Sequence, residues 1–273
     1  MKRIFFKVGL FLALGLTTTA FYSCNNDDDN SGISDNGGNG GNGSNSGNAS
    51  TITATDVING SAQITTVKAI AHWESGGEWS YETIAQTPYE NNGFTLKFPE
   101  TLADKYLVSI GEFIGSDYMT EVFISDKNAK TYFFDADDIY GYYDEDENEM
   151  GKFYLREDND NGYYDTSWMY ADRDVAVKGE GEWSNGTDKY DLNLKKGWNV
   201  VYKSQIGSYN NSTGVYVSTY TLTSQKPAGV NYSWSFYNFN STGTAAKSVE
   251  NKKSVFSKLQ EDRKNGIRQR QEK

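Results

Sequence analysis

The sequence predicts an all-β fold with a β-sandwich-like body, and three observations lead to that prediction. The chain contains six Trp, twenty Tyr and fourteen Phe but only three Pro, and aromatic residues favour strands. Short segments alternate between apolar and polar side chains, which is the pattern of half-buried strands. These segments follow one another closely, with no long helical pattern among them, which favours a sandwich or a barrel.

Residues 1–23 have the layout of a secretory signal peptide. Three basic residues precede an apolar run at 8–16, and small residues then lead to Ser23 and Cys24. A basic region, an apolar region and a small-residue region in this order are typical of such signals. The apolar run is well short of the roughly 20 residues that span a bilayer, so we expect the segment to be removed.

Cys24 is the only cysteine of the chain, so it has no internal disulfide partner, and its position after the signal favours modification. The sequence Phe21-Tyr22-Ser23-Cys24 resembles a lipobox. With the acidic run at 27–29 it is similar to surface lipoproteins of the Bacteroidota, in which such a run directs export to the cell surface. The resemblance implies acylation of Cys24, for example by palmitate, and an outward-facing anchor in the outer membrane. Two or more acyl chains give stable anchoring, since each buried methylene contributes about 0.8 kcal/mol.

Residues 24–50 are expected to form the lipidated end and a disordered tether. Positions 25–50 hold seven Gly, eight Asn, five Ser and four Asp, with only Ile33 and Ala49 besides. A segment of this composition buries too little apolar surface to offset its ordering entropy. As a flexible coil it would span roughly 25 to 30 Å, enough to hold a folded body away from a membrane surface.

The body is expected over 51–240, as a first β half at 51–171 and a second at 172–240. The alternating segments lie at 63–71, 94–98, 106–110, 121–125, 175–177, 190–194, 199–202, 215–222 and 232–239. Gly-Glu-Trp-Ser occurs at 77–80 and again at 181–184. This repeat is consistent with two related sandwich halves, and equally with one β body and a chance repeat. Residues 170–199 also resemble Bacteroidota surface proteins, a resemblance that implies no activity.

An acidic stretch at 133–165 holds twelve Asp or Glu interleaved with tyrosines. Calcium takes six to eight oxygen ligands, and the candidate calcium ligands in this stretch are Asp144, Asp146, Asp158 and Asp160. Read as an EF-hand loop from Glu157, the stretch places Trp168 where a bidentate carboxylate is required, so that motif fails. An irregular calcium site and a solvated acidic hairpin both stay open.

Exposed aromatic residues are the second kind of candidate site. Trp and Tyr on a β surface can stack on sugar rings, but aromatic residues also supply much of a protein core. We expect three or four of the six Trp to be core residues. The candidate ligand-binding residues are Trp79, Trp183, Trp168, Tyr163 and Tyr164.

Catalysis has little support in the sequence, and we expect no enzyme. His72 is the only histidine, no Gly-x-Ser-x-Gly pattern marks a nucleophilic serine, and ligands for zinc are too few. A carboxylate pair for glycoside hydrolysis is the alternative, although thirty-seven acids make the presence of such a pair uninformative.

The last segment, 241–273, is basic and is expected to be a helical or disordered tail. From Lys247 onward it has nine Lys or Arg against four acids, which leaves the middle of the chain more acidic than the net charge of −11. An acidic body argues against nucleic acid as a partner. The expected partners are the membrane, through the lipid, and a glycan or protein ligand. A purely structural role is the third possibility, and no cofactor is expected apart from the open calcium question.

Overall fold

The computed structural model describes residues 49–115, 121–143, 148–183, 186–210 and 215–239, and these belong to one compact unit. It confirms the all-β, sandwich-like class. Two sheets are present, a pair of strands (β1 and β4) and a thirteen-stranded sheet. No helix within these ranges is long and apolar enough to cross a membrane. Cys24, the tether up to residue 48 and the basic tail lie outside the described residues. Ala49 and Ser50, which were expected in the tether, are joined to the body instead: Ala49 N–H donates to the Trp198 carbonyl oxygen, and the Ser50 carbonyl oxygen accepts from Phe98 N–H.

The strands, in chain order, are β1 Thr51–Ala54, β2 Thr66–Ser75, β3 Glu78–Pro88, β4 Phe94–Lys97, β5 Val108–Ser109, β6 Phe123–Ile124, β7 Lys130–Asp135, β8 Ile139–Tyr143, β9 Asn148–Asn159, β10 Gly162–Ala171, β11 Val175–Trp183, β12 Gly186–Leu194, β13 Gly197–Asn210, β14 Val215–Thr223 and β15 Ser233–Asn238. The short helices are η1 Asp104–Tyr106, α1 Ile110–Ile114 and η2 Ala136–Asp138. The main path of the large sheet runs β3-β2-β8-β9-β10-β13-β14-β12-β11-β6. Strands on either side of the expected boundary at residue 171 pair with each other, since β10 pairs with β13 along its whole length.

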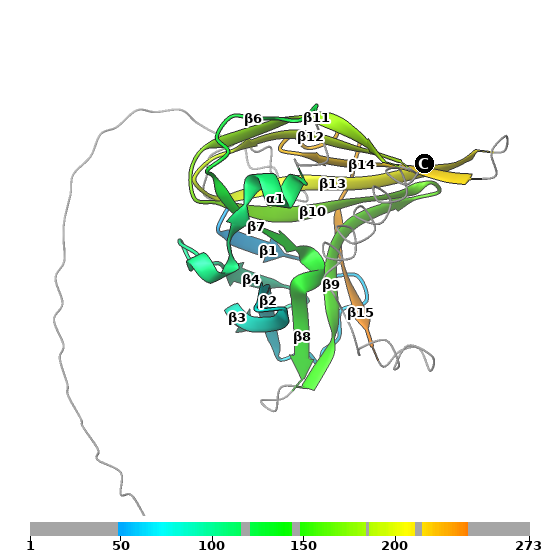
Figure 1. Ribbon diagram of the computed structural model, residues 1–273. Coiled ribbons are helices and arrows are strands. Elements are labelled where there is room, and N and C mark those ends of the chain that lie inside the picture. The colour runs from blue at the N-terminus through cyan, green and yellow to red at the C-terminus, as the bar shows by residue number, and fades with distance from the viewer. Residues whose placement is uncertain (1–48, 116–120, 144–147, 184–185, 211–214, 240–273) are drawn as a thin grey trace, which may run out of the picture. The chain divides into compact units, whose positions relative to one another are not determined.

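The large sheet branches at the β9–β10 hairpin (Figure 1). Near its turn, β9 pairs with β10. Farther from the turn the two strands separate, so that β10 pairs with β7 and β9 pairs with β8. The helix η2 connects β7 to β8 and therefore crosses from one arm of the branch to the other. We call this place the fork.

Two cores lie on opposite faces of the arm that contains β7, β10 and β13. Even-numbered residues of β10, Trp168 and Tyr170, enter the core shared with β1, β2, β4, β8, β9 and β15. Odd-numbered residues, Met169 and Ala171, enter the core that α1, β11, β12 and β14 complete. Period-two alternation therefore supplies both cores from one strand.

The strand expected at 106–110 is mostly absent, and that prediction was wrong. The segment forms η1, the two residues of β5 and the start of α1. Ser109 caps α1 by accepting a hydrogen bond from the Glu112 backbone N–H at 3.0 Å, and Gly115 ends it in the left-handed conformation at φ 71°. These are strong helix-capping signals, and they outweigh an alternation of only a few residues.

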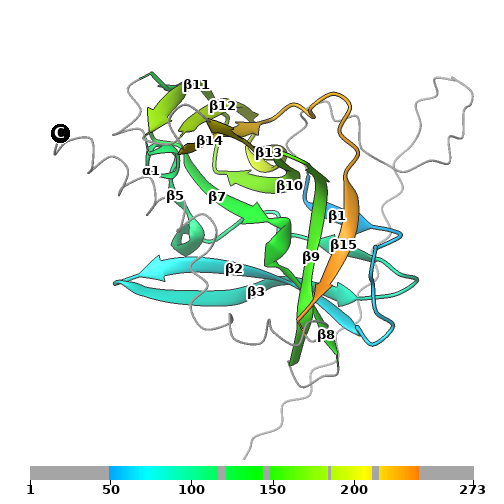
Figure 2. The ribbon, with the colours of Figure 1, turned by 90° about the vertical axis from the view of Figure 1, so that its right-hand side faces the viewer.

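Beyond Ala69, where β2 stops pairing with β8, the hairpin of β2 and β3 continues as a two-stranded ribbon whose turn points away from β9 and β15 (Figure 2). Gly76 and Gly77 form the turn with φ values of 63° and 85°, which only glycine adopts readily. The first Gly-Glu-Trp-Ser copy thus opens the second strand of its hairpin, whereas Trp183 of the second copy ends the first strand of the β11–β12 hairpin. The two copies do not occupy equivalent places.

Candidate functional site

The outer face of the β2–β3 hairpin presents aromatic side chains to solvent. Trp79 and Tyr81 are alternate residues of β3, so they point to the same side. Their side chains are 46% and 75% exposed. Across the strand pair, Trp79 lies opposite Glu74 and Tyr81 lies opposite His72. We call these four residues the aromatic face.

His72 connects the aromatic face to the helix η2. Its ring centroid is 6.4 Å from that of Tyr81, and its Nε2 is 3.7 Å from Oδ1 of Asp138. The pairing of β2 with β8 ends at Ala69, before His72. The backbone N–H of His72 instead donates a hydrogen bond to the Tyr132 hydroxyl at 2.9 Å. Burial lowers the pKa of His72, although the charge of Asp137 opposes this effect. Burial therefore favours the neutral form of the imidazole.

The inner side of the same hairpin is anchored. Glu82 pairs with Lys105 and accepts a hydrogen bond from the Tyr106 hydroxyl at 2.7 Å. The Lys105 ammonium also lies 4.4 Å from the ring centroid of Trp73, whose ring meets that of Tyr106 edge-on at 5.1 Å. These contacts fix the inner side of β3, so the exposed rings of Trp79 and Tyr81 on its outer side lie on a supported strand.

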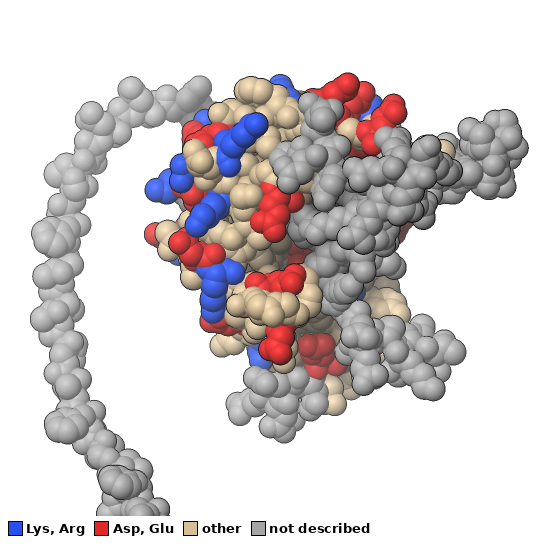
Figure 3. All heavy atoms as spheres, viewed as in Figure 1, with Lys and Arg blue, Asp and Glu red and all other residues tan. Residues whose placement is uncertain are grey.

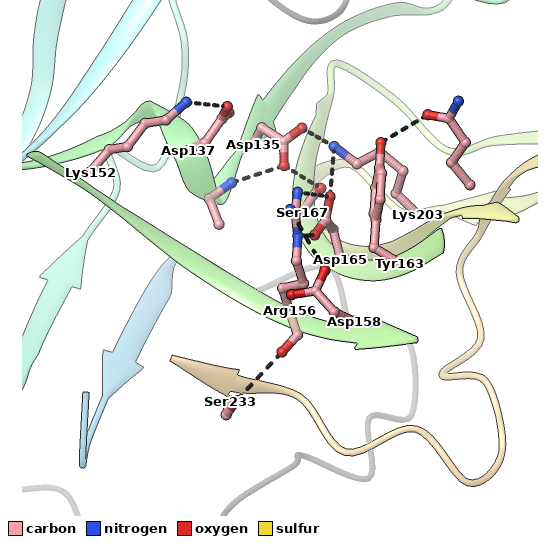
Figure 4. Close-up of polar contacts among 12 residues, drawn as sticks. Asp135, Asp137, Lys152, Arg156, Asp158, Tyr163, Asp165, Ser167, Lys203 and Ser233 are labelled. Carbon is pink, nitrogen blue, oxygen red and sulfur yellow. Dashed lines mark hydrogen bonds and ion pairs between the residues drawn. The ribbon is translucent and has the colours of Figure 1, made fainter. Parts of the chain in front are cut away.

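Next to His72, the fork is filled by an ionic cluster (Figure 4). Asp165 on β10 is the direct neighbour of Arg156 on β9 and of Lys203 on β13. It accepts from Arg156 Nε at 2.6 Å and lies 3.2 Å from the Lys203 ammonium. Lys203 also pairs with Asp135, and Lys152 pairs with Asp137 at 2.8 Å.

Asp135 explains why the chain turns at this place. Its carboxylate accepts hydrogen bonds from the Ala136 backbone N–H at 3.1 Å and from the Ser167 hydroxyl at 2.9 Å. The Asp138 carboxylate in turn accepts from the Asp135 backbone N–H at 3.3 Å, which completes a capping box on η2. These side chains satisfy backbone groups that leave the β ladder at the fork, as buried backbone requires.

The pKa values at the fork follow from burial and pairing. Burial opposes the charge of Lys203, but Asp135 and Asp165 raise the pKa of its ammonium well above the ordinary value. Burial and the neighbouring carboxylates raise the pKa of Asp138 well above its usual range. Burial acts on Asp137 in the same direction, but the nearby ammonium groups of Lys152 and Lys203 lower its pKa overall.

The expected ligand-binding residues lie in different surroundings. Trp79 is exposed, whereas Trp168 is buried and stacks against Trp234 at 6.4 Å, inside the first core. Tyr163 is half-buried and donates to Gln205 at 3.0 Å, and Tyr164 is half-buried on the other face of β10. The side chain of Trp183 lies outside the described residues. Among the other tryptophans, Trp198 and Trp234 are core residues, which agrees with the expectation of three or four core Trp.

The expected calcium ligands are only partly within the described residues. Asp158 and Asp160 are exposed at the β9–β10 turn, and Asp158 lies 3.9 Å from Arg156. Asp144 and Asp146 lie outside the described residues. In the part of the chain that the structure describes, no three His, Cys, Asp or Glu side chains gather as a group that could hold a metal ion.

Sequence reasoning missed Tyr81 and the ionic cluster. It treated the acids at 133–165 as a repelling, solvated group, whereas Asp135 and Asp165 are buried and paired with cations. A signal was available, because Lys152 and Arg156 stand at even spacing within the acidic stretch and hence on one side of a strand.

Comparisons of the chain with protein families, with curated proteins and with solved structures find no match.

Proposed function

We propose that this chain is an outer-membrane lipoprotein, anchored through Cys24, whose β body is a non-catalytic glycan-binding module facing outward. The observation that carries the binding role is the aromatic face, where Trp79 and Tyr81 lie exposed side by side on a supported strand. Flat rings of this kind stack on the apolar faces of sugars, as aromatic side chains do on other ring systems. The Glu74 carboxylate and the His72 imidazole beside them supply groups that hydrogen-bond to hydroxyls.

The binding role is tested with the chain from residue 24 onward, carrying Cys24→Ser so that it is purified without lipid, on a broad glycan array. For a ligand found there, Trp79→Ala and Tyr81→Ala should each cost roughly 2 kcal/mol of binding free energy, about thirtyfold in Kd. Phe123→Ala is the matched control, because Phe123 is 63% exposed on β6 and outside the aromatic face. Silence across the array, or equal losses for all three variants, would refute the proposal.

The anchor is tested separately in cells of a bacterial host that processes lipoproteins. The wild-type chain should incorporate a labelled palmitate analogue and fractionate with the outer membrane. The Cys24→Ala variant should do neither, since it lacks the only thiol of the chain. Extracellular protease should digest the anchored protein on intact cells if the body faces outward. A labelled Cys24→Ala variant would disprove acylation at this residue.

A glycoside-active enzyme is the second candidate function, and one observation favours it. Asp137 and Asp138 are neighbouring carboxyls in different surroundings, since Asp137 pairs with the Lys152 ammonium at 2.8 Å and Asp138 lies 3.7 Å from the His72 ring, and different surroundings are what separate acid and base roles in hydrolases. Release of reducing sugar from the glycan that the array identifies, abolished by Asp137→Asn and by Asp138→Asn, would favour this function. Binding without release favours the module.

A further inference from the structure

The charge around the aromatic face carries an inference about its ligand. Glu74 is the cross-strand neighbour of Trp79 and is exposed, so a ring stacked on Trp79 would lie beside its carboxylate. The Asp138 carboxyl stands behind His72 at 3.7 Å. The segment from His72 to Tyr81 contains two Glu and no Lys or Arg. Every formal charge on this segment is therefore negative.

Cations near the face are engaged with carboxylates. Lys105, on the inner side of the hairpin, pairs with Glu82, and Lys152 and Arg156 pair with Asp137 and Asp165. On the side of the body that Figure 3 shows, Lys and Arg side chains are interspersed with Asp and Glu instead of forming a basic patch. A carboxylate or sulfate group on a ligand would thus meet Glu74 with no Lys or Arg in the segment from His72 to Tyr81 to compensate it.

The rings also set the size of the contact. Trp79 and Tyr81 are two residues apart on β3, so their Cα atoms are separated by about 7 Å along the strand, and the His72 ring extends the row sideways from Tyr81 by 6.4 Å. The row provides adjacent flat surfaces for more than one ring, which fits a chain of sugars better than a single one.

We propose that the aromatic face takes an uncharged glycan chain and selects against glycans that carry carboxylate or sulfate groups, with Glu74 as the specificity-determining residue. This inference rests on the glycan-binding function proposed above. Glu74 acts on the ligand by like-charge repulsion, which is strongest at low ionic strength and is screened by salt.

The test uses affinity electrophoresis of the chain from residue 24 onward with Cys24→Ser, in gels that contain a neutral polysaccharide or its carboxymethylated derivative. The pairs are made from β-1,3-glucan, xylan, mannan and dextran. Wild-type protein should bind the neutral member of a pair roughly tenfold more tightly than the charged member in 20 mM salt, and the difference should shrink in 1 M NaCl. Glu74→Gln should abolish most of the discrimination, measured as the ratio of the two dissociation constants within each pair, because the amide keeps hydrogen-bonding groups but carries no charge.

Glu78→Gln is the matched control, because Glu78 is exposed on the same hairpin but on the opposite face. It removes the same charge and should keep the discrimination. Tighter binding of the carboxymethylated member, lost in Trp79→Ala, would overturn the charge inference while the glycan-binding function stands. Discrimination that is unchanged in Glu74→Gln would also overturn it. Absence of binding to every member of every pair would refute the proposed function, and this inference with it.

Discussion

Lys203 offers the sharpest test of the ionic cluster at the fork. Its side chain is 4% exposed and pairs with both Asp135 and Asp165. Lys203→Met keeps most of the length of the side chain and removes its charge. Breaking a buried ion pair from one side costs about 3 to 5 kcal/mol, because the remaining charge is buried without compensation.

The structure favours the lower end of that range. Asp165 retains Arg156 as a partner at 2.6 Å, so the uncompensated carboxylate is chiefly that of Asp135. A loss of about 3 kcal/mol is a large part of the 5 to 15 kcal/mol typical of a folded domain. For a body of this size, it corresponds to a fall in Tm of roughly 6 to 12 °C.

The measurement is urea unfolding at pH 7, followed by tryptophan fluorescence. The control is Lys189→Met, which removes an ammonium that pairs with Glu180 at 3.0 Å where both side chains are half exposed; it should change stability by less than about 1 kcal/mol. Adding Asp135→Asn to Lys203→Met should recover part of the loss, since a neutral amide does not require a cation. If Lys203→Met is as stable as the Lys189→Met control, the fork is not held by these charges.

The pH dependence has a definite sign. The raised pKa of Lys203 means that its stabilisation is complete below the ordinary Lys value near 10.4 and is lost only as pH rises through the higher folded value. In Lys203→Met the carboxylate of Asp135, whose pKa burial already raises, lacks this cation, and proton uptake relieves it. The destabilisation relative to wild type should therefore be smaller at pH 4.5 than at pH 7.5. A larger loss at the lower pH would contradict the assignment.

Changes at three further positions test other parts of the structure. A carboxyl whose pKa is raised in the folded state stabilises the fold below its unfolded pKa and loses that contribution as pH rises. Asp138→Asn should therefore be more stable than wild type at pH 8, and this gain should vanish near pH 4. Urea titrations at both pH values measure the difference. Gly151→Ala should cost about 1 to 3 kcal/mol, since its Cβ would lie 1.9 Å from the Tyr237 carbonyl oxygen, and hydrogen exchange should show β15 loosened; normal protection there would contradict this. In the wild type the Pro99 carbonyl oxygen accepts a hydrogen bond from Trp198 Nε1 at 2.8 Å. Trp198→Phe leaves that oxygen without its donor and should cost about 1 to 3 kcal/mol of stability, whereas Trp198→Ala should cost about 3 to 5 kcal/mol. Thermal unfolding that ranks the two variants in the opposite order would refute this account of the core.

The sequence predicted the fold class well because aromatic content and period-two alternation are local signals. Strands that alternate cleanly, such as β4 with Phe94 and Leu96 buried, were found from the sequence. β3 was not, because most of its residues are exposed and no apolar side marks it. Trp79 was identified through its glycine-rich turn, whereas Tyr81 shares its face only through strand geometry.

The place of Lys203 at the fork could not be predicted, because this lysine and its carboxylate partners come together only through long-range pairing. Lys203 meets Asp165 and Asp135 because β13, β10 and β7 lie side by side in a particular register. Nothing within the acidic stretch itself indicates that a lysine from a distant strand neutralises it. Charge counted along a chain therefore indicated repulsion where charge arranged in space gives attraction.

The alternation of β10 between two cores has a consequence for cooperativity. Trp168 and Tyr170 face one core while Met169 and Ala171 face the other. A slip of one residue in the register of β10 would turn the aromatic rings into the core that is fitted to the smaller side chains. The smaller side chains would at the same time enter the core that is fitted to the rings. The register of this strand is thus specified twice over, and neither core can melt without releasing the strand that the other depends on.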